Sequence, residues 1–112
     1  MIKIIKFQKQ KSTSLIKPPL SQKIKSGLIV LNQGEEIGEH RTENREEIVI
    51  IFEGKAIVNI ESKKKTVFQN HLIYIPQNKK HNIRNESQEV LKYIYVVCPC
   101  FRKIPDRGIT AI

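Results

Sequence analysis

The chain has 112 residues and a formal net charge of +9, from 20 Lys and Arg side chains against 11 Asp and Glu. This length is enough for one hydrophobic core but leaves no room for a second domain. The lysines are scattered, without a helix-turn-helix, zinc-finger or RNA-binding signature, so we expect a solvated basic surface and not a nucleic-acid interface. The chain contains no apolar run of about 20 residues, so we expect no transmembrane helix. Residues 1–11 contain too many lysines for a signal peptide. We therefore expect a cytoplasmic protein.

Short segments rich in isoleucine and valine, separated by turn residues, predict that nearly the whole chain is β-strand. Residues 1–20 are basic and end at Pro18 and Pro19. We interpret them as an edge strand or as an arm on a partner subunit, and we assign residues 21–112 to the body of the domain. Strands are expected at residues 23–32, 40–42, 46–53, 55–61, 65–69, 72–75, 81–85 and 89–97, with Lys63, Lys64 and Lys65 in a hairpin turn. This pattern is typical of a β-sandwich or β-barrel.

A first informative stretch covers residues 34–54 and places a histidine and a glutamate on expected strands. Residues two apart in a strand point to the same face of the sheet. His40 therefore shares a face with Thr42, and Glu47 shares a face with the apolar residues at every second position after it. One inward surface can thus collect an imidazole and a carboxylate.

A second stretch covers residues 70–85 and supplies another imidazole. A strand stops at Pro76, a short turn follows, and His81 opens the next strand. Lys79 and Lys80 flank this turn, where they would attract an anionic substrate or simply occupy an exposed turn.

Together the two stretches resemble the two sequence motifs of the cupin superfamily, G-x5-H-x-H-x(3,4)-E-x6-G and G-x5-P-x-G-x2-H-x3-N. The resemblance extends over residues 28–97 when the flanking strands are included. It implies an all-β, single-domain, cupin-type jelly-roll β-barrel of the small microbial kind. The matching positions are Gly34, His40, Glu47 and Gly54 in the first motif and Pro76, His81 and Asn85 in the second.

Three positions depart from the family pattern. Thr42 stands where the family usually has its second histidine, so one of the usual four metal ligands is missing or replaced by a weak hydroxyl. Asn70 and Asn78 stand where the family has glycines. Asparagine tolerates positive φ better than most residues, so we expect both turns to form.

His40, Glu47 and His81 form the expected metal site. Two neutral imidazoles and one carboxylate leave coordination positions open, and iron, manganese, zinc, nickel and copper all accept nitrogen and oxygen ligands of this kind. Thr42 is expected to be a weak or water-mediated ligand, or to hold a ligand in place by hydrogen bonding.

Two further pairs of residues have open interpretations. Tyr93 and Tyr95 alternate with apolar residues, so these tyrosines either line the pocket or cover the outside. Cys98 and Cys100 flank Pro99, which marks the end of a strand, and they are poorly placed for a disulfide with each other. We favour a structural role for the cysteines, with a metal or redox role as the alternative.

Three functions remain open at this point. The first is a metalloenzyme with isomerase- or dioxygenase-like chemistry on a small polar molecule such as a sugar, a keto acid or a phenol. The second is a noncatalytic metabolite-binding or sensor protein without a tightly bound metal, and the third is a structural or storage barrel. The fold alone does not choose among them.

The resemblance also implies a homodimer, since cupins often pair through sheet edges and exchanged N-terminal segments. Ile2, Ile4, Ile5 and Phe7 would suit such an arm.

Overall fold

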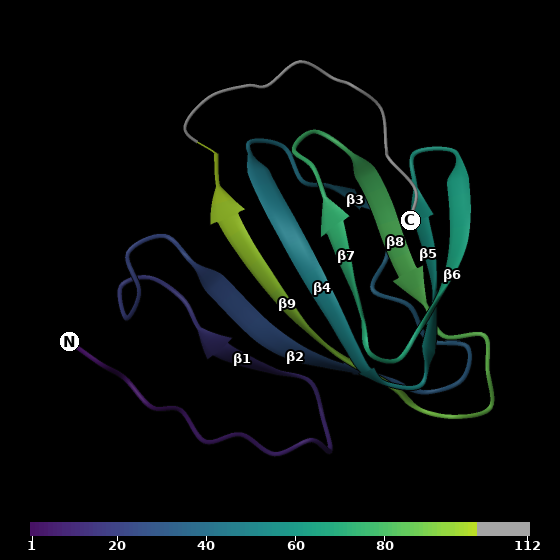
Figure 1. The fold of residues 1–112 in the computed structure, drawn as a ribbon, viewed down its shortest axis with the longest axis horizontal. Helices are drawn as coiled ribbons and strands as arrows, with labels where there is room; N and C mark the ends of the chain where they lie inside the picture. Colours follow the sequence, from purple (N-terminus) through teal and green to yellow (C-terminus); the bar gives the residue numbers. More distant parts are fainter. Residues whose placement is uncertain (101–112) are drawn as a thin grey trace.

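The computed structural model describes residues 1–100, so the last part of the expected 21–112 domain, residues 101–112, lies outside the described residues. Within residues 1–100 the chain forms nine strands and no helix (Figure 1), which confirms the prediction of an all-β chain. The strands are β1 Thr13–Ile16, β2 Lys25–Leu31, β3 His40–Arg41, β4 Arg45–Glu53, β5 Lys55–Ile60, β6 Lys63–Phe68, β7 His71–Ile75, β8 Lys80–Arg84 and β9 Leu91–Pro99. This part of the chain contains no helical segment with the length and hydrophobicity of a membrane span.

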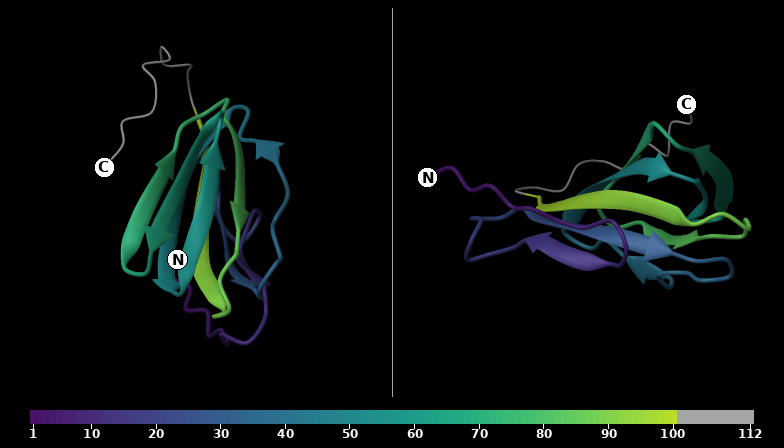
Figure 2. Two further views of the ribbon diagram at one scale, coloured as in Figure 1. Left: turned by 90° about the vertical axis from the view of Figure 1, so that its right-hand side faces the viewer. Right: turned by 90° about the horizontal axis from the view of Figure 1, so that it is seen from below.

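The strands form two sheets in which every neighbouring pair is antiparallel. The first has the order β1–β2–β9–β4–β7 and the second the order β3–β8–β5–β6. The two sheets lie face to face as layers (Figure 2), so residues 1–100 form two separate sheets and not one continuous closed barrel.

The hydrophobic core fills the space between the sheets and comes from both of them. Val49 and Ile51 on β4 are fully buried, as are Ala56 on β5 and Ile83 on β8. Glu47 is also buried, and it lies on the same face of β4 because strand side chains alternate. The sequence prediction of a shared inward face for Glu47 and the apolar residues after it is thus confirmed.

The turns between strands follow the local sequence closely. Asn70 and Asn78 have φ values of 68° and 60°, which confirms that asparagine can replace glycine at these two motif positions. The three consecutive lysines are not in a hairpin turn, because Lys63, Lys64 and Lys65 already belong to β6. The turn consists of residues 61–62, and Glu61 supplies the positive φ of 54° that it requires.

Residues 1–12 form no strand and are exposed. The Lys3 ammonium donates a hydrogen bond of 2.7 Å to the Leu20 carbonyl oxygen, and the Lys9 ammonium lies 5.7 Å from the centre of the Phe52 ring. Ile2 and Ile4 remain largely exposed.

Gly54, the last glycine of the first motif, is required both by its backbone conformation and by space. Its φ is 82°, and a Cβ at this position would overlap the Val90 carbonyl oxygen. Gly34 has nearly the same φ, 85°, but a Cβ there would meet no atom within 4 Å. A comparison of Gly34 with Gly54 therefore separates the cost of a positive φ from the cost of steric overlap.

We expect Gly34→Ala to lower the free energy of unfolding by about 1–2 kcal/mol, the usual cost of a side chain in the left-handed region. Gly54→Ala should cost about 3 kcal/mol or more, because overlap with the β9 entry adds to the same strain. Urea unfolding of both variants measures the difference, and equal losses would contradict the steric role of Gly54.

Candidate metal centre

His40 and His81 are brought side by side by the pairing of two short strands. They occupy directly opposite positions in the antiparallel pair of β3 and β8. Their ring centroids are 4.0 Å apart, with an angle of 62° between the planes. His81 is almost fully buried, whereas His40 is exposed at the rim.

Glu47 reaches the same point from the opposite sheet. It lies on β4, between Ile75 of β7 and Val97 of β9. Its Oε1 atom is 3.5 Å from Nε2 of His81, and potential ligand atoms of His40, Glu47 and His81 all lie within 4.8 Å of one another. The three residues chosen from the sequence therefore converge on one point between the sheets.

Both imidazoles are oriented by main-chain carbonyl groups two residues before them. Nδ1 of His40 lies 3.1 Å from the Gly38 oxygen, and Nδ1 of His81 lies 3.3 Å from the Lys79 oxygen. A carbonyl oxygen only accepts hydrogen bonds, so these contacts favour the tautomer with the proton on Nδ1. The lone pair of each Nε2 is then available to a metal, an arrangement common among metal-binding histidines.

Nε2 of His81 is buried and has no hydrogen-bond partner. A buried polar atom without a partner costs about 1–3 kcal/mol. Because this nitrogen faces the Glu47 carboxylate, a cation between the two would satisfy both groups. The residues present therefore fit a divalent metal.

Thr42 lines the cavity, but its hydroxyl is engaged by the main chain. Oγ1 donates to the Pro76 oxygen at 2.9 Å and accepts a hydrogen bond from the Lys79 nitrogen at 3.1 Å. The Thr42 nitrogen in turn donates to the Lys79 oxygen at 3.2 Å, which is the same oxygen that faces Nδ1 of His81. Thr42 thus fastens the turn before β8 and, through it, helps to position His81.

The site opens into a cavity of about 300 Å³ between the sheets. Residues of three kinds line it: the ligand candidates His40 and Glu47 together with Thr42, apolar and aromatic side chains, and cations. The full lining is Lys25, Ile29, Ile37, His40, Arg41, Thr42, Arg45, Glu47, Tyr93, Tyr95 and Val97. His81 is not one of these lining residues, but it is buried beside His40, with the two ring centroids 4.0 Å apart.

Of the two placements considered for Tyr93 and Tyr95, the structure has both rings lining the cavity. Tyr95 lies opposite Gly27 in the β2–β9 pair, and a Cβ on Gly27 would overlap the Tyr95 ring. Burial, and secondarily the Glu47 carboxylate, raises the pKa of both phenols above the ordinary value of 10.0. Both hydroxyl groups therefore stay protonated at neutral pH and can donate hydrogen bonds.

The cations of the cavity are not those expected from the sequence. Lys79 is buried, and Nζ of Lys80 lies 3.8 Å from Oε1 of Glu39. Neither lysine lines the cavity. Lys25, Arg41 and Arg45 line it instead. The position of Arg45, two residues before Glu47 on one strand, was the sequence feature that could have identified it.

The two cysteines lie outside the cavity. Both are free thiols of intermediate exposure. The last strand, β9, ends at Pro99, the proline expected to mark a strand end, and so runs two residues beyond the expected range of 89–97. Cys98 lies opposite Glu46, so it follows the outward-facing positions of β9, whereas its neighbour Val97 lines the cavity.

A family model of the cupin domain matches residues 27–97. The match covers more than half of the chain and contains all three ligand candidates. This chain therefore belongs to the cupin family. No curated protein shows significant sequence similarity to it.

Solved cupin structures show the same fold. An RmlC-like cupin family protein with a double-stranded β-helix fold from Methanocaldococcus jannaschii has a TM-score of 0.76 at 23% identity, over 88% of this chain and 92% of that one. A predicted oxalate decarboxylase from Thermotoga maritima has a TM-score of 0.74 at 19% identity, over 79% and 78% of the two chains. The Cnp3 cupin domain of Schizosaccharomyces pombe has a TM-score of 0.72 at 17% identity over 79% of this chain, which spans 63% of that one. At these identities the likeness establishes the fold.

Proposed function

We propose that this cupin binds one divalent metal ion through His40, Glu47 and His81, and that it acts on a small polar molecule in the adjoining cavity. The observation that carries the proposal is the buried Nε2 atom of His81, which has no hydrogen-bond partner and faces Glu47 at 3.5 Å. Two imidazoles and one carboxylate suit iron, manganese, zinc, nickel or copper and leave positions open for a ligand.

The cavity supplies what such chemistry needs. A metal held there would polarise a carbonyl or hydroxyl group of the ligand or, in the case of iron, support dioxygen chemistry. The protonated Tyr93 and Tyr95 hydroxyls can hold ligand oxygen atoms by donating hydrogen bonds. Ile29 and Val97 add apolar surface that limits the access of water. These features support isomerase- or dioxygenase-like chemistry on a ligand small enough for about 300 Å³.

A noncatalytic metabolite-binding or sensor role is the second candidate, and Thr42 is the observation that favours it. Its hydroxyl is committed to Pro76 and Lys79, so the protein lacks the fourth ligand of its family and would hold a metal less tightly. This candidate requires that a ligand stabilise the fold by mass action without being converted to product.

Metal content of the purified chain tests the proposal. We expect about one equivalent of a divalent metal after reconstitution, because three donors converge on one point. His81→Ala and Glu47→Gln should each lower the affinity more than about 100-fold, beyond the usual effect of residues that only support ligands.

The matched control is His71→Ala, since His71 is an exposed histidine on β7 outside the three-residue group. It should bind metal as the native chain does. Circular dichroism confirms that each variant is folded. A reconstituted native chain without metal, or equal loss in the His71 variant, would contradict the proposal.

We also propose that the protein is a homodimer formed through the outer face of the five-stranded sheet. Apolar side chains cover neighbouring strands there in register, with half-buried Ile48, Ile94 and Val96 beside Ile50 at 37%, Leu72 at 47% and Tyr74 at 47% exposure. These residues form two rows across β9, β4 and β7, and neither row contains a charged side chain. A second copy can therefore pack against the same face by twofold symmetry without local charge repulsion.

The double variant Ile50→Lys, Leu72→Lys should be a monomer, because pairing would then bury four ammonium groups. Light scattering measures the mass. Phe68→Lys is the matched control, since Phe68 is 55% exposed on β6 of the other sheet, and it should leave the dimer intact. A dimeric double variant would rule out this face, and monomers produced by deleting residues 1–11 alone would assign the contact to the N-terminal arm.

A further inference from the structure

The mouth of the cavity has a strongly cationic lining. Lys25, Arg41 and Arg45 come from three different strands and line the cavity with exposed side chains, whereas Glu47 is the only acidic residue among the described residues that line it. A divalent metal would add to this positive charge. A concave site lined by one sign of charge attracts ligands of the opposite sign.

Lys25 and Arg45 differ from the lysines scattered over the basic surface in their position on the sheet. Lys25 lies in the same cross-strand row as Val97 and Glu47, and Arg45 is two residues before Glu47 on β4. Both cations thus occupy positions of the sheet face that points toward the other sheet. Inward-pointing charges protect exposed sheet edges in some proteins. Because β2 and β4 are interior strands, edge protection does not explain Lys25 and Arg45.

These cations are also available to a ligand. Within residues 1–100, Lys25 and Arg45 form no ion pair. The Arg41 guanidinium donates through Nη1 to the Asn78 oxygen at 2.9 Å, which holds it at the mouth while its other donors remain. Strand spacing places the Cα atoms of Lys25 and Glu47 about 10 Å apart, which is twice the distance between neighbouring strands.

We propose that Arg45 and Lys25, with Arg41, form a carboxylate-binding subsite, so that the ligand of this cavity is a short carboxylic acid. The inference rests on the proposed use of the cavity as a metal-containing binding site and adds its substrate class. A guanidinium binds a planar carboxylate through two parallel hydrogen bonds. We choose a carboxylate over a phosphate because the described chain offers no helix N-terminus, on which many phosphate sites are built.

The subsite can be tested by calorimetric titration of the full chain at constant ionic strength, both metal-free and reconstituted with Zn²⁺. The probes are malonate, its uncharged analogue malonamide, and inorganic phosphate. Malonate should bind at least about tenfold more tightly than malonamide, since a hydrogen bond to a charged group contributes more than one to a neutral group. Arg45→Gln and Lys25→Gln should each weaken malonate binding by about tenfold or more while the zinc content stays at its native level.

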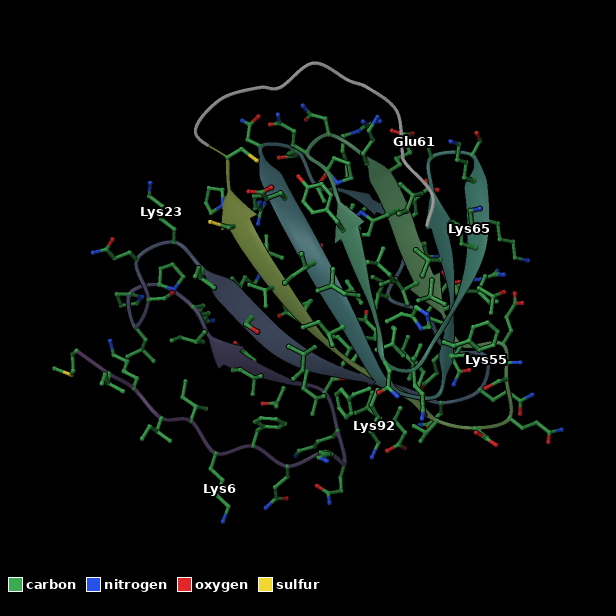
Figure 3. All side chains as sticks on the ribbon, in the orientation of Figure 1. Lys6, Lys23, Lys55, Glu61, Lys65 and Lys92 are labelled. Carbon is green, nitrogen blue, oxygen red and sulfur yellow. The ribbon has the colours of Figure 1, made fainter. Side chains whose placement is uncertain are left out.

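Lys65→Gln is the matched control, because it removes the same charge from an exposed residue of β6, labelled in Figure 3, that does not line the cavity. It should bind malonate as the native chain does. Malonate binding that depends on Arg45 in a chain that takes up no zinc would support the subsite while overturning the metal proposal. Equal affinity for malonate and malonamide, an unchanged Arg45 variant, or tighter binding of phosphate than of malonate would overturn the carboxylate assignment.

Discussion

The architecture of this site depends on one constraint, which is the fixed orientation of two neighbouring imidazoles. His40 and His81 face each other across the β3–β8 pair, and each ring is held at Nδ1 by a carbonyl group of its own strand entry. Nε2 of His81 is buried without a hydrogen-bond partner and lies 3.5 Å from Oε1 of Glu47. Because the histidines and the glutamate belong to different sheets, the three candidate ligands come together only when the two sheets pack against each other.

The sequence predicted the parts of this arrangement that follow from local rules. Alternation along β4 placed Glu47 and Val49 on one inward face, and the tolerance of asparagine for positive φ explained why the turns at Asn70 and Asn78 survive without glycine. These are properties of single strands and single turns. They require no knowledge of which strands become neighbours.

What could not be predicted depends on the pairing of distant strands. Lys25 meets the cavity only because β2 pairs with β9, which in turn pairs with β4. The Thr42 hydroxyl is used by the turn at residues 76–79, a contact across 34 residues of sequence, and this contact determines that Thr42 positions His81. Lys79 and Lys80 were expected near the ligand because of their closeness in sequence to His81, yet neither lines the cavity.

The loss of the second motif histidine and the cationic mouth would both increase the contribution of the ligand's carboxylate to binding. A three-residue donor set leaves more coordination positions for the ligand, and a carboxylate held by Arg45 and Lys25 would add affinity that the metal alone does not provide. Thr42 helps to position His81 through the turn at residues 76–79. In the function proposed here, the cavity would therefore combine a three-residue metal site with an anion-binding subsite.

The most direct measurement is a crystal structure of the zinc-reconstituted chain with diffraction data collected on both sides of the zinc absorption edge. We expect one anomalous peak bonded to Nε2 of His40, Nε2 of His81 and a carboxylate oxygen of Glu47, at about 2.0–2.2 Å from each. A peak at Cys98 and Cys100 instead, or no peak between the two sheets, would contradict a metal site formed by these three residues.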